Sequence, residues 1–138
     1  MNRVGMKRFT LLEVMIVLML LVILAGAVTP AYLNYMKKAK VQSAKSESKL
    51  LADAVEHYYL EVGHYPSSLE ALVSNIDNET RWNGPYLNGK LPKDPWDNDY
   101  VLSVPGKAGD FDIVSWGADG KSGGTGDAAD LYSSDMEE

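Results

Sequence analysis

The chain opens with a long apolar run that follows a short basic leader. Residues 14–28 are all apolar or glycine, without a single charge. Extended to residues 9–29, the run would form a helix of about 31 Å at ~1.5 Å per residue, close to the ~30 Å core of a lipid bilayer. The pattern therefore predicts a membrane-spanning helix near the N-terminus. Pro30 stands at its far end, and prolines are tolerated in membrane helices.

Helical spacing continues beyond Pro30, at first polar and lysine-rich and then amphipathic. Apolar residues recur three and four positions apart, which predicts a stripe facing a core. The stripe comprises Leu51, Ala54, Val55, Tyr58, Tyr59 and Val62. Gly63 follows and is a typical C-cap residue. The sequence thus predicts one long helix, apolar in its first half and amphipathic in its second.

Shorter elements are predicted after the long helix. Residues 67–76 have helical spacing, with Ser67 or Ser68 as the N-cap. Residues 100–104 and 111–116 are rich in β-formers and flank a Gly- and Pro-containing loop, which predicts an antiparallel hairpin. The expected fold class is α+β, with a long N-terminal helix packed on a small antiparallel sheet.

Composition limits the remainder of the chain to one small domain. The chain has 138 residues and no cysteine, so no disulfide can stabilise it. Only three of the 13 basic residues and one of the 19 acidic residues precede residue 31, so ten basic residues face eighteen acidic ones in the remainder. This acidic balance argues against a nucleic-acid partner.

Glu13 is the one charge near the start of the apolar helix. A charge in a membrane span is expensive and usually has a partner and a purpose, although a residue so near the helix start can also snorkel to the headgroups. A secretory signal peptide would explain the basic leader and the small residues 25–27, which could serve as a cleavage site. It would leave the length of the apolar run and Glu13 unexplained.

The segment Phe9-Thr10-Leu11-Leu12-Glu13-Val14 resembles the signature of type IV pilins and pseudopilins. The resemblance implies that a prepilin peptidase cuts between Arg8 and Phe9 and methylates the new amine. Arg8 stands where the family has Gly, whereas Pro30 stands where the family has Pro. The resemblance also implies that Glu13 neutralises the α-amine of Phe9, in its own or in a neighbouring subunit, and so sets the register of a filament.

Two later motifs combine turns with aromatic side chains. The first is Gly63-His64-Tyr65-Pro66, and the second spans residues 91–100, Leu-Pro-Lys-Asp-Pro-Trp-Asp-Asn-Asp-Tyr. Taken alone they are structural, because proline sets the dihedrals and the aromatic rings supply apolar area. Together they resemble the major pseudopilins of type II secretion. Asp97 and Asp99 stand where that family more often has Gly and Pro.

The tail from residue 117 mixes carboxylates with glycines. Such a segment suits a hard cation such as Ca²⁺, which takes six to eight oxygen ligands, although the spacing is not that of an EF-hand. The alternative is a solvated acidic loop. The resemblance implies one Ca²⁺ held by Asp119 and Asp130, with Asp127 as the candidate third carboxylate and the carbonyls of Trp116 and Ala118 completing the shell. Residues 132–138 match nothing and are expected to be disordered.

The sequence gives little support for catalysis. His57 and His64 form no pair with metal-ligand spacing, and no Ser lies in a nucleophile motif. The Gly-rich segment 117–126 is acidic and would repel phosphate. We therefore expect no enzymatic activity and a structural or surface role for both histidines.

Three hypotheses result. The first is a major pseudopilin with a leader at residues 1–8, a transmembrane assembly helix at 9–30 and a periplasmic head at 31–138. It would span the bacterial inner membrane once and drive protein export as a helical filament. Its implied partners are further copies, minor pseudopilins, the inner-membrane assembly platform and the prepilin peptidase. The second is a type IV pilin or competence pseudopilin, disfavoured because such pilins usually close their C-terminal region with a disulfide. The third is a monomeric membrane-anchored calcium-binding module, which leaves Glu13 unexplained.

Overall fold

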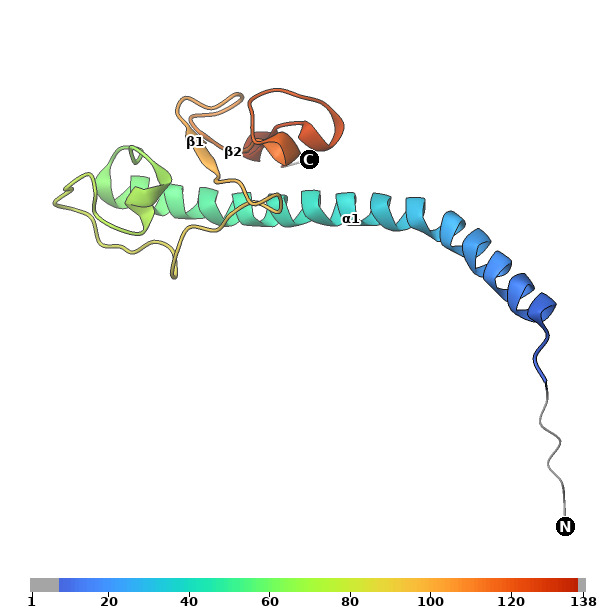
Figure 1. Ribbon diagram of the computed structural model, residues 1–138. Helices are drawn as coiled ribbons and strands as arrows, with labels where there is room; N and C mark the ends of the chain where they lie inside the picture. The colour runs from blue at the N-terminus through green and yellow to red at the C-terminus, as the bar shows by residue number, and fades with distance from the viewer. Residues whose placement is uncertain (1–7, 137–138) are drawn as a thin grey trace, which may run out of the picture. The chain divides into compact units, whose positions relative to one another are not determined.

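One helix, α1 (Leu11–Val62), accounts for more than a third of the chain in this computed structural model, which describes residues 8–136 (Figure 1). The chain divides into two units, Met1–Lys37 and Lys38–Glu138. The first contains the start of α1. The second contains the end of α1, the strands β1 (Val101–Ser103), β2 (Asp112–Ser115) and β3 (Leu131–Tyr132), and four short 3₁₀ helices. These are η1 (Leu69–Leu72), η2 (Gly117–Asp119), η3 (Gly126–Ala128) and η4 (Ser133–Met136).

The first unit has the predicted apolar helix. The Thr10 hydroxyl accepts a hydrogen bond from the Glu13 amide at 3.2 Å, and the Thr10 carbonyl accepts one from the Val14 amide, so Thr10 caps the helix start. The large apolar side chains of this part of α1 are exposed, and α1 is long and apolar enough to cross a membrane. Pro30 lies inside α1, as predicted, and the helix continues through it.

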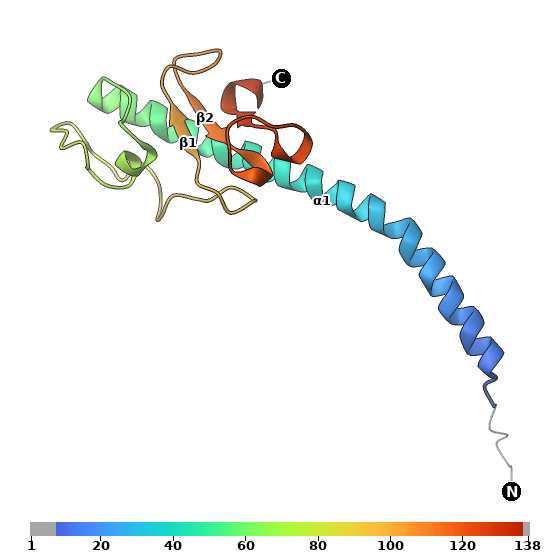
Figure 2. The same cartoon turned by 45° about the horizontal axis from the view of Figure 1, so that its top comes forward.

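The second unit has its core between the far half of α1 and the sheet. The buried residues of α1 recur at helical spacing: Ala44, Ser48, Leu51, Ala54, Val55, Tyr58 and Val62. They pack against residues such as Leu72, Leu87 and Ile113. Figure 2 shows β1 and β2 lying over the teal-to-green part of α1. Tyr59, predicted to face the core, is 42% exposed because its ring stacks outside the core on Tyr65, with centroids 4.6 Å apart.

The predicted antiparallel hairpin is confirmed, with Leu102 opposite Ile113, although both strands are shorter than expected. The sheet has the order β1-β2-β3, so β2 is central and is buried along its whole length. The third strand was not predicted. Of the tail expected to be disordered, residues 132–136 are instead part of β3 and η4, and residues 137–138 lie outside the described part of the chain.

The predicted helix over residues 67–76 is wrong, since only the single 3₁₀ turn η1 forms there. Side chains and backbone from the following loop occupy the carbonyls that a longer helix would use. The Trp82 indole donates to the Ala71 carbonyl at 2.8 Å, and the Tyr86 amide donates to the Leu72 carbonyl at 2.8 Å. Ser68 occupies the N-cap position without a side-chain capping bond.

Tyrosine hydroxyl groups fix the loops to the helix. Tyr100 donates to Glu47 at 2.7 Å, and Tyr86 donates to Glu61 at 2.6 Å. Helix α1 ends at Val62, and Gly63 follows with a φ of 98°, a left-handed conformation that glycine adopts without strain. The predicted helix end is therefore confirmed. The result is a head in which long loops are attached to a helical stem at several points.

Candidate functional site

The N-terminal candidate site consists of Arg8, Phe9, Glu13 and Pro30. Phe9 is exposed, and Glu13 lies in the first turn of α1. The Thr10–Glu13 contact follows the S/T-x-x-E pattern of a capping box, a local role for these residues that sequence reasoning missed. Residues 1–7 of the predicted leader lie outside the described residues. What the structure provides is an exposed apolar helix that carries one carboxylate near its start.

The C-terminal candidate site is the loop of residues 116–130. Trp116 precedes η2, which contains Ala118 and Asp119, while Asp127 lies in η3. The two turns lie against each other at Gly117, whose φ is 64°. A Cβ there would come within 2.9 Å of the Asp127 carbonyl oxygen and 2.8 Å of that of Ala129. Only glycine fits this approach, so the predicted loop is a tightly folded segment.

Asp130 is held inside this loop by one of its two carboxylate oxygens. Its Oδ2 accepts hydrogen bonds from the Gly123 amide at 2.8 Å and from the Tyr132 hydroxyl at 3.4 Å. Its Oδ1 is buried and has no hydrogen-bond partner. A buried carboxylate oxygen without a partner is unfavourable unless a cation or water satisfies it. A carboxylate oxygen of this kind fits the donor chemistry that Ca²⁺ requires.

The structure does not bring all the predicted ligands together as a carboxylate cluster. Asp119 and Asp127 are exposed, and Asp119 Oδ1 accepts a hydrogen bond from the Lys121 amide at 3.1 Å. Within residues 8–136, no group of three or more His, Asp or Glu residues is arranged to hold a metal. A cation in this loop would therefore depend mainly on backbone carbonyls.

Buried hydrogen bonds of Asp94 hold the start of the loop, a role that sequence reasoning missed. We call this set of hydrogen bonds the Asp94 bracket. Asp94 is 4% exposed; its Oδ1 accepts hydrogen bonds from the amides of Trp96 and Asn98, and its Oδ2 accepts one from the Ser115 hydroxyl at 2.6 Å. The side-chain amide of Asn98 in turn donates to the Gly117 carbonyl at 2.8 Å. The Asp-Pro-Trp turn thus positions the start of the loop. Asp97 has a φ of 72°, which a glycine would adopt more easily.

Hydrogen bonds to Asp112 hold the other end of the loop of residues 116–130. We call them the Asp112 bracket. The Asp112 side chain is buried and accepts hydrogen bonds from the amides of Lys107 at 2.6 Å and Ser134 at 2.9 Å, and from the Ser133 hydroxyl at 3.1 Å. Burial opposes ionisation of Asp112, but these hydrogen bonds outweigh it and lower the pKa of the carboxyl. Asp112 therefore attaches the chain after β3 to the hairpin.

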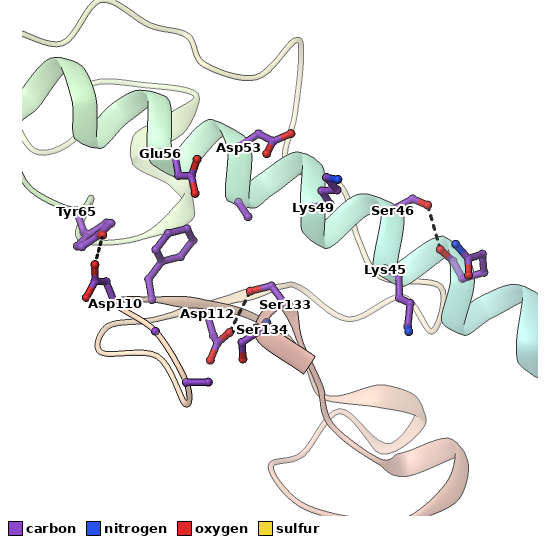
Figure 3. A pocket seen from close by; sticks show the side chains of 15 residues that line it. Lys45, Ser46, Lys49, Asp53, Glu56, Tyr65, Asp110, Asp112, Ser133 and Ser134 are labelled. Carbon is purple, nitrogen blue, oxygen red and sulfur yellow. Dashed lines mark hydrogen bonds between the residues drawn. The ribbon is translucent and has the colours of Figure 1, made fainter. Parts of the chain in front are cut away.

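An open groove of about 910 Å³ runs between α1 and the hairpin loop (Figure 3). One wall carries charged side chains of α1, and the other carries Asp110 and the serines after β3. The groove holds neither histidine. The Tyr65 carbonyl and the Glu79 carboxylate flank the two ring nitrogens of His64 and raise its pKa, so His64 has a structural role.

A long helix with an apolar first half, and with a three-stranded antiparallel sheet packed on its second half, is the architecture of pilin-like subunits. The family model described as "Type II secretion system (T2SS), protein G" matches residues 31–134. The chain is 42% identical over 137 residues to the type II secretion system core protein G of Pseudomonas aeruginosa, which covers 95% of this chain and 96% of the relative. It is 43% identical over 129 residues to the core protein G of Vibrio cholerae, and this match covers 89% of the chain and 88% of that relative.

A solved structure agrees with these relatives. The crystal structure of the major pseudopilin from the type 2 secretion system of enterohaemorrhagic Escherichia coli matches with a TM-score of 0.61 and 34% identity, over 72% of this chain and 90% of that chain. The chain therefore belongs to the type II secretion system core protein G family, the major pseudopilins. The predicted fold class and the identification as a major pseudopilin of type II secretion are confirmed, and the family is a structural one.

Proposed function

We propose that the chain polymerises through its N-terminal helix into a filament that drives the export of proteins across the outer membrane. The observation that carries this proposal is the exposed apolar surface of α1, which ends in a single carboxylate at Glu13. Such a surface can be covered by lipid in the free subunit and by the same helix of other copies in a filament. The subunit acts by assembly, without a catalytic step of its own.

The remaining features of the proposal follow the family. The chain spans the inner membrane once, with residues 31–138 in the periplasm. The prepilin peptidase removes residues 1–8 and methylates Phe9, although Arg8 replaces the usual Gly. Minor pseudopilins and the inner-membrane assembly platform complete the set of partners.

Deleting the gene in the bacterium that carries it should stop the export of proteins through the type II pathway. We expect the exported proteins to accumulate in the periplasm, and we expect a plasmid copy of the intact gene to restore their release. Immunoblots of culture medium and periplasmic extract measure both. Unchanged release in the deletion strain, with no second pseudopilin gene expressed, would contradict the proposed function.

We further propose that the loop of residues 116–130 binds one Ca²⁺. Asp119 and Asp130 would supply side-chain oxygens, Asp127 is the third candidate, and the carbonyls of Trp116 and Ala118 would contribute. The unpartnered buried Oδ1 of Asp130 supports this assignment. Bound calcium would supply positive charge that holds the two turns η2 and η3 together, while the Asp94 and Asp112 brackets position the ends of the loop.

Calcium should therefore raise the unfolding temperature of the full chain in an uncharged detergent. A ligand that binds only the folded state adds roughly 2.7 kcal/mol at 100 times its dissociation constant, which corresponds to several degrees in a head of this size. Near-UV circular dichroism with Ca²⁺ or with EGTA measures the shift. We expect Asp119→Ala to lose it and Asp53→Ala, which removes an exposed carboxylate on α1, to keep it. Equal unfolding temperatures of the wild type with and without calcium would rule out the site.

A further inference from the structure

Charge is distributed unevenly along the head. Only Glu13 and Glu47 among the acidic residues precede residue 50, so seventeen acidic residues follow it, against five basic ones. Four lysines, in contrast, lie between residues 38 and 49 on α1. The second unit is therefore basic at its beginning and strongly acidic beyond it.

Part of this charge forms a stripe on one face of α1. With 3.6 residues per turn, Lys38, Lys45 and Lys49 fall on the same side of the helix, and Glu56 follows two turns after Lys49 with Asp53 beside it. The structure agrees, because Lys45, Lys49, Asp53 and Glu56 all line the groove of Figure 3. We call Lys38, Lys45, Lys49, Asp53 and Glu56 together the bipolar stripe. Its first half is basic and its second half is acidic.

The basic half has no ion-pair partner in the part of the chain that the structure describes. Within residues 8–136, Lys38, Lys45 and Lys49 form no ion pair within 4.0 Å. Figure 3 shows Lys45 and Lys49 apart from the carboxylates of Asp110 and Asp112 across the groove. Lys45 and Lys49 are four positions apart, a spacing at which like charges destabilise a helix. Asp53, four positions after Lys49, offsets this repulsion at the end of the basic half, whereas Lys38 and Lys45 would gain from an acidic partner outside the chain.

We propose that the bipolar stripe is a contact surface for a second copy of this chain, with the basic half of one copy facing the acidic half of its neighbour. This inference rests on the proposed polymerisation and adds to it the electrostatic surface that selects the stagger. Parallel helices in register would place lysine against lysine. A neighbour displaced along the helix axis by about 6 Å, the span from Lys49 to Asp53, to about 16 Å, the span from Lys45 to Glu56, places lysine against carboxylate at ~1.5 Å per residue.

Such a contact is heterologous, because two different surface regions of identical chains meet. Heterologous contacts do not close on themselves unless the rotation brings them into a ring, and otherwise generate open helical filaments. Like charges that meet across an interface suppress wrong arrangements more strongly than opposite charges add affinity. The stripe would therefore act mainly by excluding the unstaggered arrangement.

Charge reversal tests the proposal on the processed chain, residues 9–138, reconstituted in vesicles of uncharged phosphatidylcholine. The critical concentration for assembly is measured by sedimentation and electron microscopy. We expect Lys45→Glu/Lys49→Glu to raise that concentration about tenfold or more, because reversal converts attraction into repulsion. Asp53→Lys/Glu56→Lys should do the same. The chain with all four reversals has its polarity inverted, so assembly should return to within about threefold of the wild type.

The matched control is Lys90→Glu/Lys93→Glu, which makes the same charge change on exposed lysines away from the stripe and from the loop of residues 116–130, and should assemble like the wild type. Circular dichroism checks that each variant is folded. A wild-type level of assembly in both double reversals, or no recovery in the fourfold variant, would overturn the proposal while leaving polymerisation itself intact. If the wild-type chain does not assemble at all, both the stripe contact and the proposed polymerisation are wrong.

Discussion

Glu13→Gln should abolish self-association of the mature chain in a bilayer while leaving its insertion unchanged. The substitution removes the charge and keeps the size and the helix propensity of the side chain. It also keeps the Thr10 hydroxyl as acceptor for the amide of residue 13, so the start of α1 should be unaffected. The filament should fail because an uncharged amide cannot neutralise the α-amine of a neighbouring subunit in an apolar environment, where unpaired charges cost several kcal/mol.

Chemical cross-linking of the mature chain, which begins at Phe9, in vesicles measures this result. We expect at least a tenfold loss of the multimer ladder. Two variants separate charge from capping. Glu13→Asp retains a carboxylate and should assemble in part, whereas Thr10→Val removes the cap and keeps the charge. We expect Thr10→Val to assemble nearly normally, since a lost cap costs only about 1 kcal/mol. A full ladder from Glu13→Gln would show that the carboxylate has no role in assembly.

The second large effect is expected at Asp112, where Ala should lower the free energy of unfolding of the head by about 3 kcal/mol. The substitution leaves the part-buried amides of Lys107 and Ser134 without their acceptor, and each unsatisfied group costs about 1–3 kcal/mol. The unfolding temperature should fall by roughly 10–20 °C. Asp110→Ala is the matched control. Its carboxylate is exposed and accepts only a long hydrogen bond from the Tyr65 hydroxyl at 3.4 Å, so we expect a change within about 0.5 kcal/mol.

The same bracket should make the stability of the head depend on pH. Because the pKa of Asp112 is lower in the folded state than in the unfolded state, its ionised form stabilises the fold. This contribution is fully present above about pH 4, the ordinary range of an Asp carboxyl, and is lost as the pH falls through the lower folded value. Urea unfolding between pH 7 and pH 2 measures this effect. The free energy of unfolding of the wild type should exceed that of Asp112→Asn, and this difference should narrow only at acid pH. A difference that is constant with pH would exclude Asp112 as the titrating group.

The local features of this fold could be predicted from the sequence, whereas the contacts that position the loop could not. Helical periodicity identifies the buried face of α1, and Gly63 marks its end. The hairpin follows from two β-rich runs around a short loop. These signals lie within a few residues of each other, so no knowledge of distant partners is needed.

The larger errors arise where partners lie outside the predicted element or where a segment is too short to show a pattern. The helix predicted over residues 67–76 shortens to η1 because Trp82 and Tyr86 take its carbonyls. Strand β3 contains only Leu131 and Tyr132, too few to show alternation. The bracket at Asp94 has a weak local signal, an Asp before a Pro-containing turn, but its bond to Ser115 has none.

The place of β3 in the sheet also bears on the order of folding during synthesis. The central strand β2 pairs with β1, which precedes it, and with β3, which begins sixteen residues after β2 ends. During synthesis β3 therefore leaves the ribosome only after β1, β2 and the loop of residues 116–130. Until then, one edge of β2 is open to pairing with other nascent chains. If the apolar half of α1 enters a membrane first, as the proposed function requires, each unfinished head is tethered to the bilayer during the interval in which it is most prone to aggregate.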